Sequence, residues 1–246
     1  MASFQDRIKK LSSDKSPLIL ANDYDSGTAN IESRTVQNIK SLSPYLCAIK
    51  FNFHLLLPLG QKQITRITSL AHDCNLQTIA DIKLNDIGNT NDVTAQTLWS
   101  MGFDSVIVNP VMGPGNLEKI IAHAHKNRNG VISLCHMSSP EAQMTYELPV
   151  QIKSKKTILY HLFLEWASSL GADGIIVGAT FPDIVRFCKK KSKGRVSIYS
   201  PGIGTQGGDI QKTIGAGSDY LIVGRTILNS KNPKQTAKSL FDLAKN

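Results

Sequence analysis

The stretch ADIKLNDIGNT, residues 80–90, places two acids and one base within six residues of each other: Asp81, Lys83 and Asp86. Residues two apart along a strand face the same side, about 6.6 Å from each other. Asp81 and Lys83 are therefore expected to point together at the end of one strand. Charged side chains are normally kept out of a protein core. The spacing predicts either a structural ion-pair network or the reacting groups of a catalytic site.

The elements that would position these residues alternate along the chain. Segments with helical spacing, such as residues 63–75 and 157–173, lie between short apolar runs, and the second ends with Gly171 at the C-terminal cap. The apolar runs are rich in β-branched residues and predict eight strands, at residues 18–23, 47–50, 77–83, 105–109, 130–135, 174–177, 196–200 and 220–224. Eight right-handed βαβ units fit a closed (β/α)8 TIM barrel. No linker-like composition interrupts the pattern, so residues 1–246 are expected to form a single domain.

One connection departs from the short spacing of the others. Residues 137–156, after the fifth predicted strand, look like a long loop. A loop of this length in a compact domain is more often a lid or a binding loop than a simple connection.

Polar residues gather where the predicted strands end, which is where (β/α)8 barrels hold their active sites. Asp23 ends the first strand, Lys50 ends the second, and Ser138 and Ser139 follow the fifth. Together with Asp81 and Lys83 of the third strand, Asp23 and Lys50 would form an array of alternating aspartates and lysines. Such an array can be partly buried, because each charge is flanked by opposite charges.

Two glycine-rich segments follow the last two predicted strands. SPGIGTQGGD, residues 200–209, follows the seventh strand, and IVGRTI, residues 222–227, belongs to the end of the eighth. These are the positions at which barrels commonly bind phosphate. Glycines let backbone N–H groups approach an anion, and Gln206 and Arg225 can add side-chain donors. The sequence therefore predicts a phosphate site.

The charge balance agrees with an anionic partner. The chain has 28 Lys and Arg residues against 19 Asp and Glu residues, a formal net charge of +9. Nucleic acid, a membrane surface and a phosphorylated metabolite are all anionic. The densest basic run, residues 188–195, lies between a predicted helix and a predicted strand, where solvated lysines are expected. Nucleic acid is therefore not predicted as a partner.

The cysteines and the hydropathy limit the class of protein further. Four widely spaced cysteines without a CxxC pair predict reduced thiols in a cytoplasmic protein and no zinc site: Cys47, Cys74, Cys135 and Cys188. No uncharged stretch approaches the length of a bilayer span, so neither export nor a membrane partner is predicted.

The motifs together resemble one family, orotidine 5′-phosphate decarboxylase of the short microbial and archaeal type. Asp81, Lys83 and Asp86 match its D-x-K-x-x-D signature. Further matches are MSSP at residues 137–140, VGAT at 177–180, PGIGTQGGD at 201–209 and GR at 224–225. The resemblance covers nearly the whole chain. It implies decarboxylation of orotidine 5′-monophosphate (OMP) to uridine 5′-monophosphate (UMP), the last step of pyrimidine biosynthesis, without metal or organic cofactor.

The resemblance also implies roles for individual residues. Lys83 would supply positive charge and a proton at C6 of the pyrimidine, where CO₂ leaves and where the ring cannot delocalise the electron pair. Asp81 would lie beside the departing carboxylate. In the homodimer that the resemblance implies, Asp86 and Thr90 would reach into the site of the partner subunit, where Asp86 would hold Lys83.

The remaining predicted site residues would bind the substrate. Asp23 and Lys50 match the positions that contact the ribose hydroxyls, and Ser138 matches the serine that bonds the pyrimidine edge. The phosphate end comprises Pro201, Gln206, Gly224 and Arg225. Two departures from the family pattern, Ser139 and Gly88, leave open which of Ser138 and Ser139 contacts the base.

Two alternatives remain at this stage. The magnesium-dependent sugar-phosphate enzymes of the same superfamily, 3-keto-L-gulonate-6-phosphate decarboxylase and hexulose-phosphate synthase, share the D-x-K-x-x-D strand. They need an acidic metal ligand from the region of the second strand, where this chain has Lys50. The other alternative is a noncatalytic anion-binding protein, whose binding to polynucleotide would be salt-sensitive and would persist without Lys83.

Overall fold

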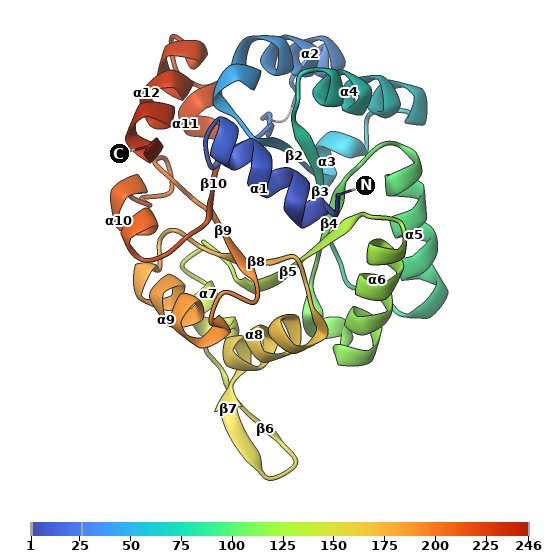
Figure 1. Ribbon diagram of the computed structural model, residues 1–246, viewed down its shortest axis with the longest axis vertical. Helices are drawn as coiled ribbons and strands as arrows, with labels where there is room; N and C mark the ends of the chain where they lie inside the picture. The colour runs from blue at the N-terminus through green and yellow to red at the C-terminus, as the bar shows by residue number, and fades with distance from the viewer. Residues whose placement is uncertain (1, 26, 246) are drawn as a thin grey trace.

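Eight parallel strands close into a barrel in the computed structural model, which describes residues 2–25 and 27–245 (Figure 1). Around the barrel the strand order is β1-β10-β9-β8-β5-β4-β3-β2. The strands are β1 (Leu18–Ala21), β2 (Ala48–Asn52), β3 (Gln77–Leu84), β4 (Ser105–Val108), β5 (Gly130–His136), β8 (Gly174–Val177), β9 (Ser197–Pro201) and β10 (Tyr220–Val223). The predicted (β/α)8 barrel is confirmed, and each predicted strand overlaps one of these eight. Residues 1, 26 and 246 of the predicted domain lie outside the described residues.

Helices surround the barrel and connect its strands (Figure 1). Gly171 ends α8 with φ of 80°, as its sequence position predicts. No helix within the described ranges is long and apolar enough to cross a membrane. The α-helices are α1 (Phe4–Asp14), α2 (Ile31–Leu42), α3 (Phe53–Leu56), α4 (Gln61–Asp73), α5 (Gly88–Ser100), α6 (Pro114–Lys126), α7 (Ala142–Thr145), α8 (Leu159–Leu170), α9 (Pro182–Ser192), α10 (Ile210–Gly215), α11 (Arg225–Leu228) and α12 (Pro233–Lys245). Two 3-10 turns, η1 (Ser43–Tyr45) and η2 (Pro110–Met112), complete the set.

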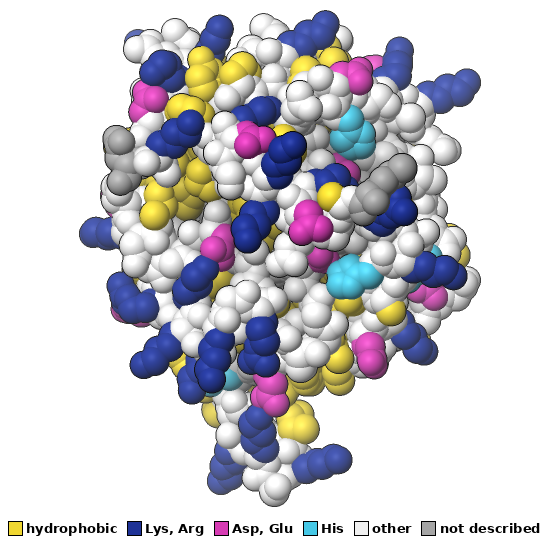
Figure 2. Space-filling model, viewed as in Figure 1, with side chains coloured by type: hydrophobic (Ala, Val, Ile, Leu, Met, Phe, Trp, Pro, Cys, Tyr) yellow, Lys and Arg dark blue, Asp and Glu magenta, His cyan; other side chains and the backbone are white. Residues whose placement is uncertain are grey.

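The basic run at residues 188–195 spans the last turn of α9 and the connection to β9. Lys189 forms an ion pair with Asp219 at 2.6 Å, and the Lys191 ammonium lies over the Phe187 ring. Lysines at a helix C-terminus also interact favourably with the helix dipole. Figure 2 shows the Lys and Arg side chains of one face spread over many elements, with Asp and Glu among them. These contacts agree with a solvated, structural basic run.

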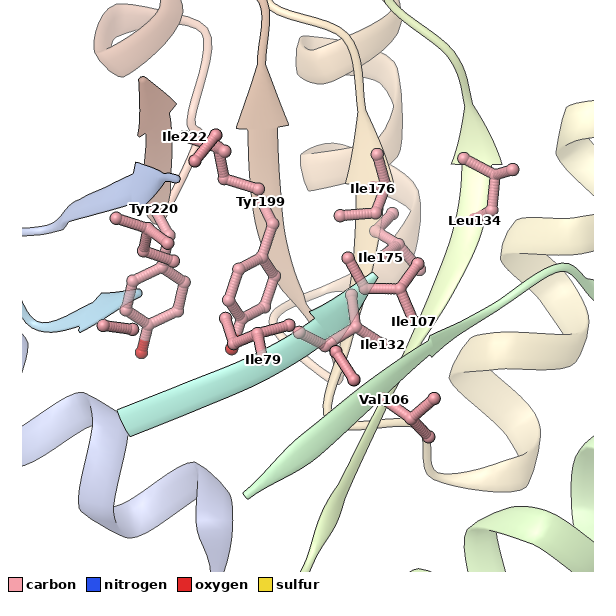
Figure 3. Packing of buried hydrophobic residues seen from close by; sticks show 14 of the residues in the cluster. Ile79, Val106, Ile107, Ile132, Leu134, Ile175, Ile176, Tyr199, Tyr220 and Ile222 are labelled. Carbon is pink, nitrogen blue, oxygen red and sulfur yellow. The ribbon is translucent and has the colours of Figure 1, made fainter. Parts of the chain in front are cut away.

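The barrel interior is filled by large apolar side chains (Figure 3). Five of the barrel strands, β1, β4, β5, β8 and β10, are buried at every residue, as expected for parallel strands covered on both sides. The Tyr199 and Tyr220 rings stack with centroids 4.5 Å apart. Gly174 leaves the space that Tyr199 fills, since a Cβ at Gly174 would lie 2.2 Å from the tyrosine ring. The interior is therefore a packed core and not a channel.

The segment after β5 differs from the expected long loop. It contains the short helix α7 and a hairpin of two antiparallel strands, β6 (Pro149–Ile152) and β7 (Lys155–Ile158), which projects from the body (Figure 1). The prediction of a long loop at residues 137–156 is therefore wrong for the parts that form α7, β6 and β7. The hairpin turn places Lys153 at φ of 55°, where Gly or Asn would have signalled a turn in the sequence.

Helix α1 closes the end of the barrel at which the strands begin. This end lies opposite the strand ends that carry the predicted site. The Asp104 carboxylate holds this end together, bonding Arg7 of α1 at 3.0 Å, His72 at 2.9 Å and the backbone N–H of Thr78 at 2.8 Å. Burial raises the pKa of Asp104, but these donors outweigh burial and the pKa is lowered. This cluster stabilises the end opposite the site.

Candidate active site

A cavity of about 280 Å³ opens where the strands of the barrel end. Its walls come from β1, β2 and β3 on one side, from β9 and β10 on the other, and from the segment after β5. Nine of the eleven residues predicted for the site line it, namely Asp23, Lys50, Asp81, Lys83, Ser138, Pro201, Gln206, Gly224 and Arg225. The structure thus brings together residues that lie up to two hundred positions apart in sequence.

The charged residues of β2 and β3 form a continuous array in this cavity. Asp81 accepts a hydrogen bond from Lys50 Nζ at its Oδ2 (2.9 Å) and from Lys83 Nζ at its Oδ1 (2.8 Å). Lys50 Nζ also bonds Asn52 and lies 3.9 Å from Asp23 Oδ1. The expected alternation of aspartates and lysines is therefore present within one chain, with Asp81 bridging both ammonium groups.

An irregularity in β3 brings Lys83 to Asp81. The pairing of β3 with β4 shifts register between Asp81 and Leu84, and Lys83 adopts φ of 45°. A left-handed conformation costs an L-residue about 1–2 kcal/mol. Strain of this kind clusters at functional sites. The two side chains meet as predicted, but through a bulge and not through the regular alternation of a strand.

The two aspartates of the array differ in their hydrogen-bond partners. Burial raises the pKa of Asp81, but the ammonium groups of Lys50 and Lys83 outweigh burial and lower it, so Asp81 is ionised at neutral pH. Asp23 Oδ1 is buried and has no hydrogen-bond partner among the described residues. Buried polar atoms are nearly always satisfied. The unsatisfied oxygen of Asp23 at the cavity wall is thus available to a ligand hydroxyl.

At the other side of the cavity, the glycine-rich segment after β9 folds back on itself. Gly208 N–H donates to the Gly202 carbonyl at 3.0 Å, and Gly204 N–H donates to the Gly208 carbonyl at 2.8 Å. Thr205 N–H donates to Thr226 Oγ1, which ties this segment to the one after β10. The exposed Arg225 guanidinium makes no hydrogen bond or ion pair with any residue that the structure describes. It is free to meet an anion.

Ser138 is held against the end of β8 by residues of the VGAT motif. Thr180 Oγ1 donates to the Ser138 carbonyl at 2.9 Å, and a Cβ at Gly178 would lie 2.5 Å from Ser138 Cα. Ser139 also lines the cavity, but its carbonyl accepts the Ala142 N–H that begins α7. The VGAT motif matches the family pattern, but its sequence alone gives its residues no role. Their close contact with Ser138 supplies one.

Asp86 and Thr90 do not line the cavity of their own chain. Both are exposed, in the connection from β3 to α5 and in the first turn of α5. The Asp86 carboxylate accepts the N–H of Ile87 at 2.8 Å, and the Asp86 N–H donates to Asn91. Their contribution to a partner subunit's site stays a prediction.

Several cavity residues were absent from the sequence prediction. Asn52 lies two positions beyond Lys50 on the same face of β2, a spacing that could have revealed it. Four apolar side chains form the floor, where composition gives no functional signal: Ile107, Leu134, Ile176 and Ile222. Among residues 2–25 and 27–245, no group of three or more His, Cys, Asp and Glu side chains is arranged to hold a metal ion.

The fold and cavity define the class: a (β/α)8 barrel enzyme with its charged site at the carboxyl ends of the strands. Residues 16–240 match the family model described as Orotidine 5'-phosphate decarboxylase / HUMPS family. A Pyrococcus abyssi protein named Orotidine 5'-phosphate decarboxylase is 34% identical over 212 residues, 86% of this chain and 93% of the relative. The chain belongs to this family, as its motifs predict.

Solved structures agree with this assignment. The orotidine 5'-phosphate decarboxylase of Pyrococcus horikoshii has a TM-score of 0.76 and 31% identity, covering 93% of this chain and 99% of that one. The orotidine 5'-monophosphate decarboxylase of Methanocaldococcus jannaschii, complexed with inhibitor BMP, has a TM-score of 0.78 and 27% identity. This second match covers 93% of this chain and 98% of the other.

The lowered pKa of Asp81 predicts how its contribution to stability depends on pH. A carboxylate whose pKa is lowered on folding stabilises the fold above its unfolded pKa of about 3.9, and this contribution is lost as pH falls through the folded pKa. At pH 7, Asp81→Asn should cost about 3 kcal/mol, because it leaves two ammonium groups without their shared partner. The difference between wild type and variant should shrink below about pH 4. Urea unfolding from pH 2.5 to 7 measures it, and a constant difference would contradict the shared ion pair.

Proposed function

We propose that this protein decarboxylates OMP to UMP in pyrimidine biosynthesis, with no metal or organic cofactor. The observation that carries the proposal is Asp81 bridging Lys50 and Lys83 in a cavity whose far side has Arg225, which is unpaired among the described residues. A cation fixed beside a carboxylate suits a reaction that develops negative charge at one carbon. The free guanidinium and the glycine-rich segment suit a substrate phosphate.

In the proposed reaction, the bond between C6 and the carboxylate breaks, CO₂ leaves and the electron pair stays on C6. Lys83 Nζ stabilises this charge and donates its proton to form the C6–H bond. Solvent then restores the lysine proton, since the Lys83 side chain is 39% exposed. Asp81, 2.8 Å from Lys83 Nζ, keeps the ammonium group in place and lies beside the departing carboxylate.

The same proposal assigns the substrate-binding residues. The unsatisfied oxygen of Asp23 accepts a ribose hydroxyl, and Lys50 lies next to it. Ser138 bonds the pyrimidine edge, and its fixed backbone favours it over Ser139 for this contact. The phosphate lies at the other end, among the substrate-binding residues after β9 and β10: Pro201, Gln206, Gly224 and Arg225.

We further propose a homodimer in which Asp86 and Thr90 complete the site of the partner subunit. Asp86 and Thr90 are close in sequence to Ile87 and Val93, whose large apolar side chains are more than half exposed in the single chain. Further large apolar side chains that are more than half exposed lie in or directly after α3 and in η2, which follow the neighbouring strands β2 and β4: Phe53, Leu57 and Val111. Clusters of exposed apolar residues mark interaction surfaces, and a shared site would explain why Asp86 does not line its own cavity.

The competing function is that of the magnesium-dependent sugar-phosphate enzymes of the superfamily. Such an enzyme would need an acidic metal ligand at the second strand. Lys50 occupies that position here, and its ammonium group donates a hydrogen bond to Asp81. Because the two functions differ in their need for metal, a chelator separates them.

The first experiment measures OMP conversion by ultraviolet absorbance in excess EDTA, with UMP identified by chromatography. Wild-type protein should convert OMP, and Lys83→Ala should lose at least about 10³-fold in kcat, because the cation at C6 is removed. The circular dichroism spectrum should be unchanged, since Lys83 is partly exposed. Near-normal turnover by Lys83→Ala would refute the role of Lys83, and turnover of sugar phosphates only when magnesium is restored would favour the competing function.

A second prediction concerns the phosphate end. Arg225→Ala should lower kcat/KM for OMP by about 10²-fold, because one charge-assisted contact to phosphate contributes about 1.5–3 kcal/mol. The loss should be far smaller for orotidine, the substrate without phosphate. Steady-state kinetics on both substrates test this, and an equal loss on both would contradict the assignment of Arg225.

The shared site makes a third prediction. Lys83→Ala and Asp86→Ala should each be inactive alone, yet a mixture unfolded and refolded together should regain about a quarter of wild-type activity. Half of the random dimers would be hybrids, each with one intact site of two. Mixing without subunit exchange is the control. Failure of the co-refolded dimers to regain activity would show that Asp86 does not act across the interface.

A further inference from the structure

His136, the last residue of β5, has no role in the proposed reaction but lies two positions before Ser138. Its side chain is completely buried. Three aromatic rings surround it, with centroids 5.7 Å away at Tyr146, 5.6 Å at Tyr160 and 4.6 Å at Phe181. These rings come from the residue after α7, from α8 and from the residue before α9, so His136 lies where three segments meet the end of the strand.

Both ring nitrogens of His136 have partners. Nδ1 lies 2.9 Å from the carbonyl oxygen of Met137, and Nε2 lies 3.3 Å from Glu147 Oε1. Because a carbonyl oxygen only accepts hydrogen bonds, Nδ1 carries a proton and donates it. The ring thereby connects residue 137 with residue 147, the two ends of the segment that carries Ser138, Ser139 and α7.

Backbone contacts extend this closure on both sides. Gly178 N–H donates to the His136 carbonyl at 3.1 Å, and Tyr160 N–H donates to the Tyr146 carbonyl at 2.9 Å. Residues 137–147 therefore form a closed loop whose ends are held by one buried imidazole. Ser138 lies directly after the anchored end.

We propose that His136 and Glu147 are positioning residues that latch residues 137–147 closed and thereby hold Ser138 at the pyrimidine end of the site. The inference rests on the proposed function for its effect on the substrate, but the latch itself is a property of the protein alone.

The Glu147 contact requires a proton between His136 Nε2 and the carboxylate, because Nδ1 already donates to Met137. Burial lowers the pKa of His136 below its ordinary value, so the ring loses its second proton before neutrality as pH rises, and a lone pair then faces the carboxylate. Burial raises the pKa of Tyr146 and Tyr160 to about 12, and a hydrogen bond with Cys188, together with burial, raises the pKa of the Cys135 thiol. These three neighbours therefore stay neutral over this range, and the latch is complete at acid pH and weakens as pH rises toward neutrality.

Two substitutions of Glu147 should therefore behave differently. Glu147→Ala removes the contact at every pH. Glu147→Gln instead offers an amide N–H that can donate to Nε2 of the neutral ring. The glutamine variant should therefore keep the latch and lose its pH dependence.

The experiment measures kcat and KM for OMP from pH 5 to 8, together with hydrogen exchange of residues 137–147 in the free protein. At pH 5, Glu147→Ala should raise KM about tenfold with a much smaller change in kcat, as expected when a contact shared by ground and transition state is lost. Exchange of residues 137–147 should become faster than in wild type at that pH. Glu147→Gln should keep the wild-type values of pH 5 up to pH 8, where wild type should approach Glu147→Ala. His136→Asn, which keeps a donor for Met137 only, should resemble Glu147→Ala.

Glu165→Ala is the matched control, because it breaks an exposed ion pair between Glu165 on α8 and Lys155 on β7 and should change neither measurement. Wild-type KM and exchange in Glu147→Ala at pH 5 would overturn the latch, as would a Glu147→Gln variant no better than Glu147→Ala. If wild-type protein does not convert OMP, the proposed function fails, while hydrogen exchange still tests the latch.

Discussion

The site depends on one interaction, the carboxylate of Asp81 shared between Lys50 and Lys83. Two ammonium groups at the end of a barrel would repel each other and lose hydration, so their burial requires an anion between them. The parallel pairing of β2 with β3 supplies it, because the register sets Asn52 opposite Asp81 and so brings Lys50 beside the carboxylate. The bulge at Lys83 then completes the bridge at the cost of local strain. The array is close to neutral as a whole, yet it holds a cation at a fixed point.

The barrel separates this charged end from the parts that stabilise the fold. Below the array, Ile107, Leu134, Ile176 and Ile222 form an apolar floor. This floor keeps water from the lower side of the charges and so strengthens their interaction. At the opposite end, Asp104 ties α1 and α4 to the barrel through donors that satisfy it fully. Strain and an unsatisfied oxygen at one end are thus compatible with a stable protein, because the stabilising network lies elsewhere.

The sequence predicts those features that depend on local pattern. All eight strands follow from apolar β-branched runs, and nine of the eleven site residues line one cavity because parallel strands of a barrel end on the same side. The hairpin after β5 and the bulge in β3 were not predictable. Lys153 and Lys83 both take positive φ, which tertiary contacts impose against the preference of lysine. Likewise, the need for glycine at position 178 follows from its close contact with the Ser138 backbone, which the sequence does not show.

The two ends of the cavity are in contact through Gly202. A Cβ at this position would lie 2.8 Å from Gln206 Oε1 and 3.1 Å from Ser138 Cβ, so the glycine lets the segment after β9 pack directly on the segment after β5. In the proposed reaction, Gln206 meets the phosphate and Ser138 the base. Phosphate binding that orders the first segment therefore also restricts the second, and binding energy from a group remote from C6 is used to fix the pyrimidine against Lys83. This packing gives a physical reason why the phosphate would affect the rate of the reaction as well as the affinity for the substrate.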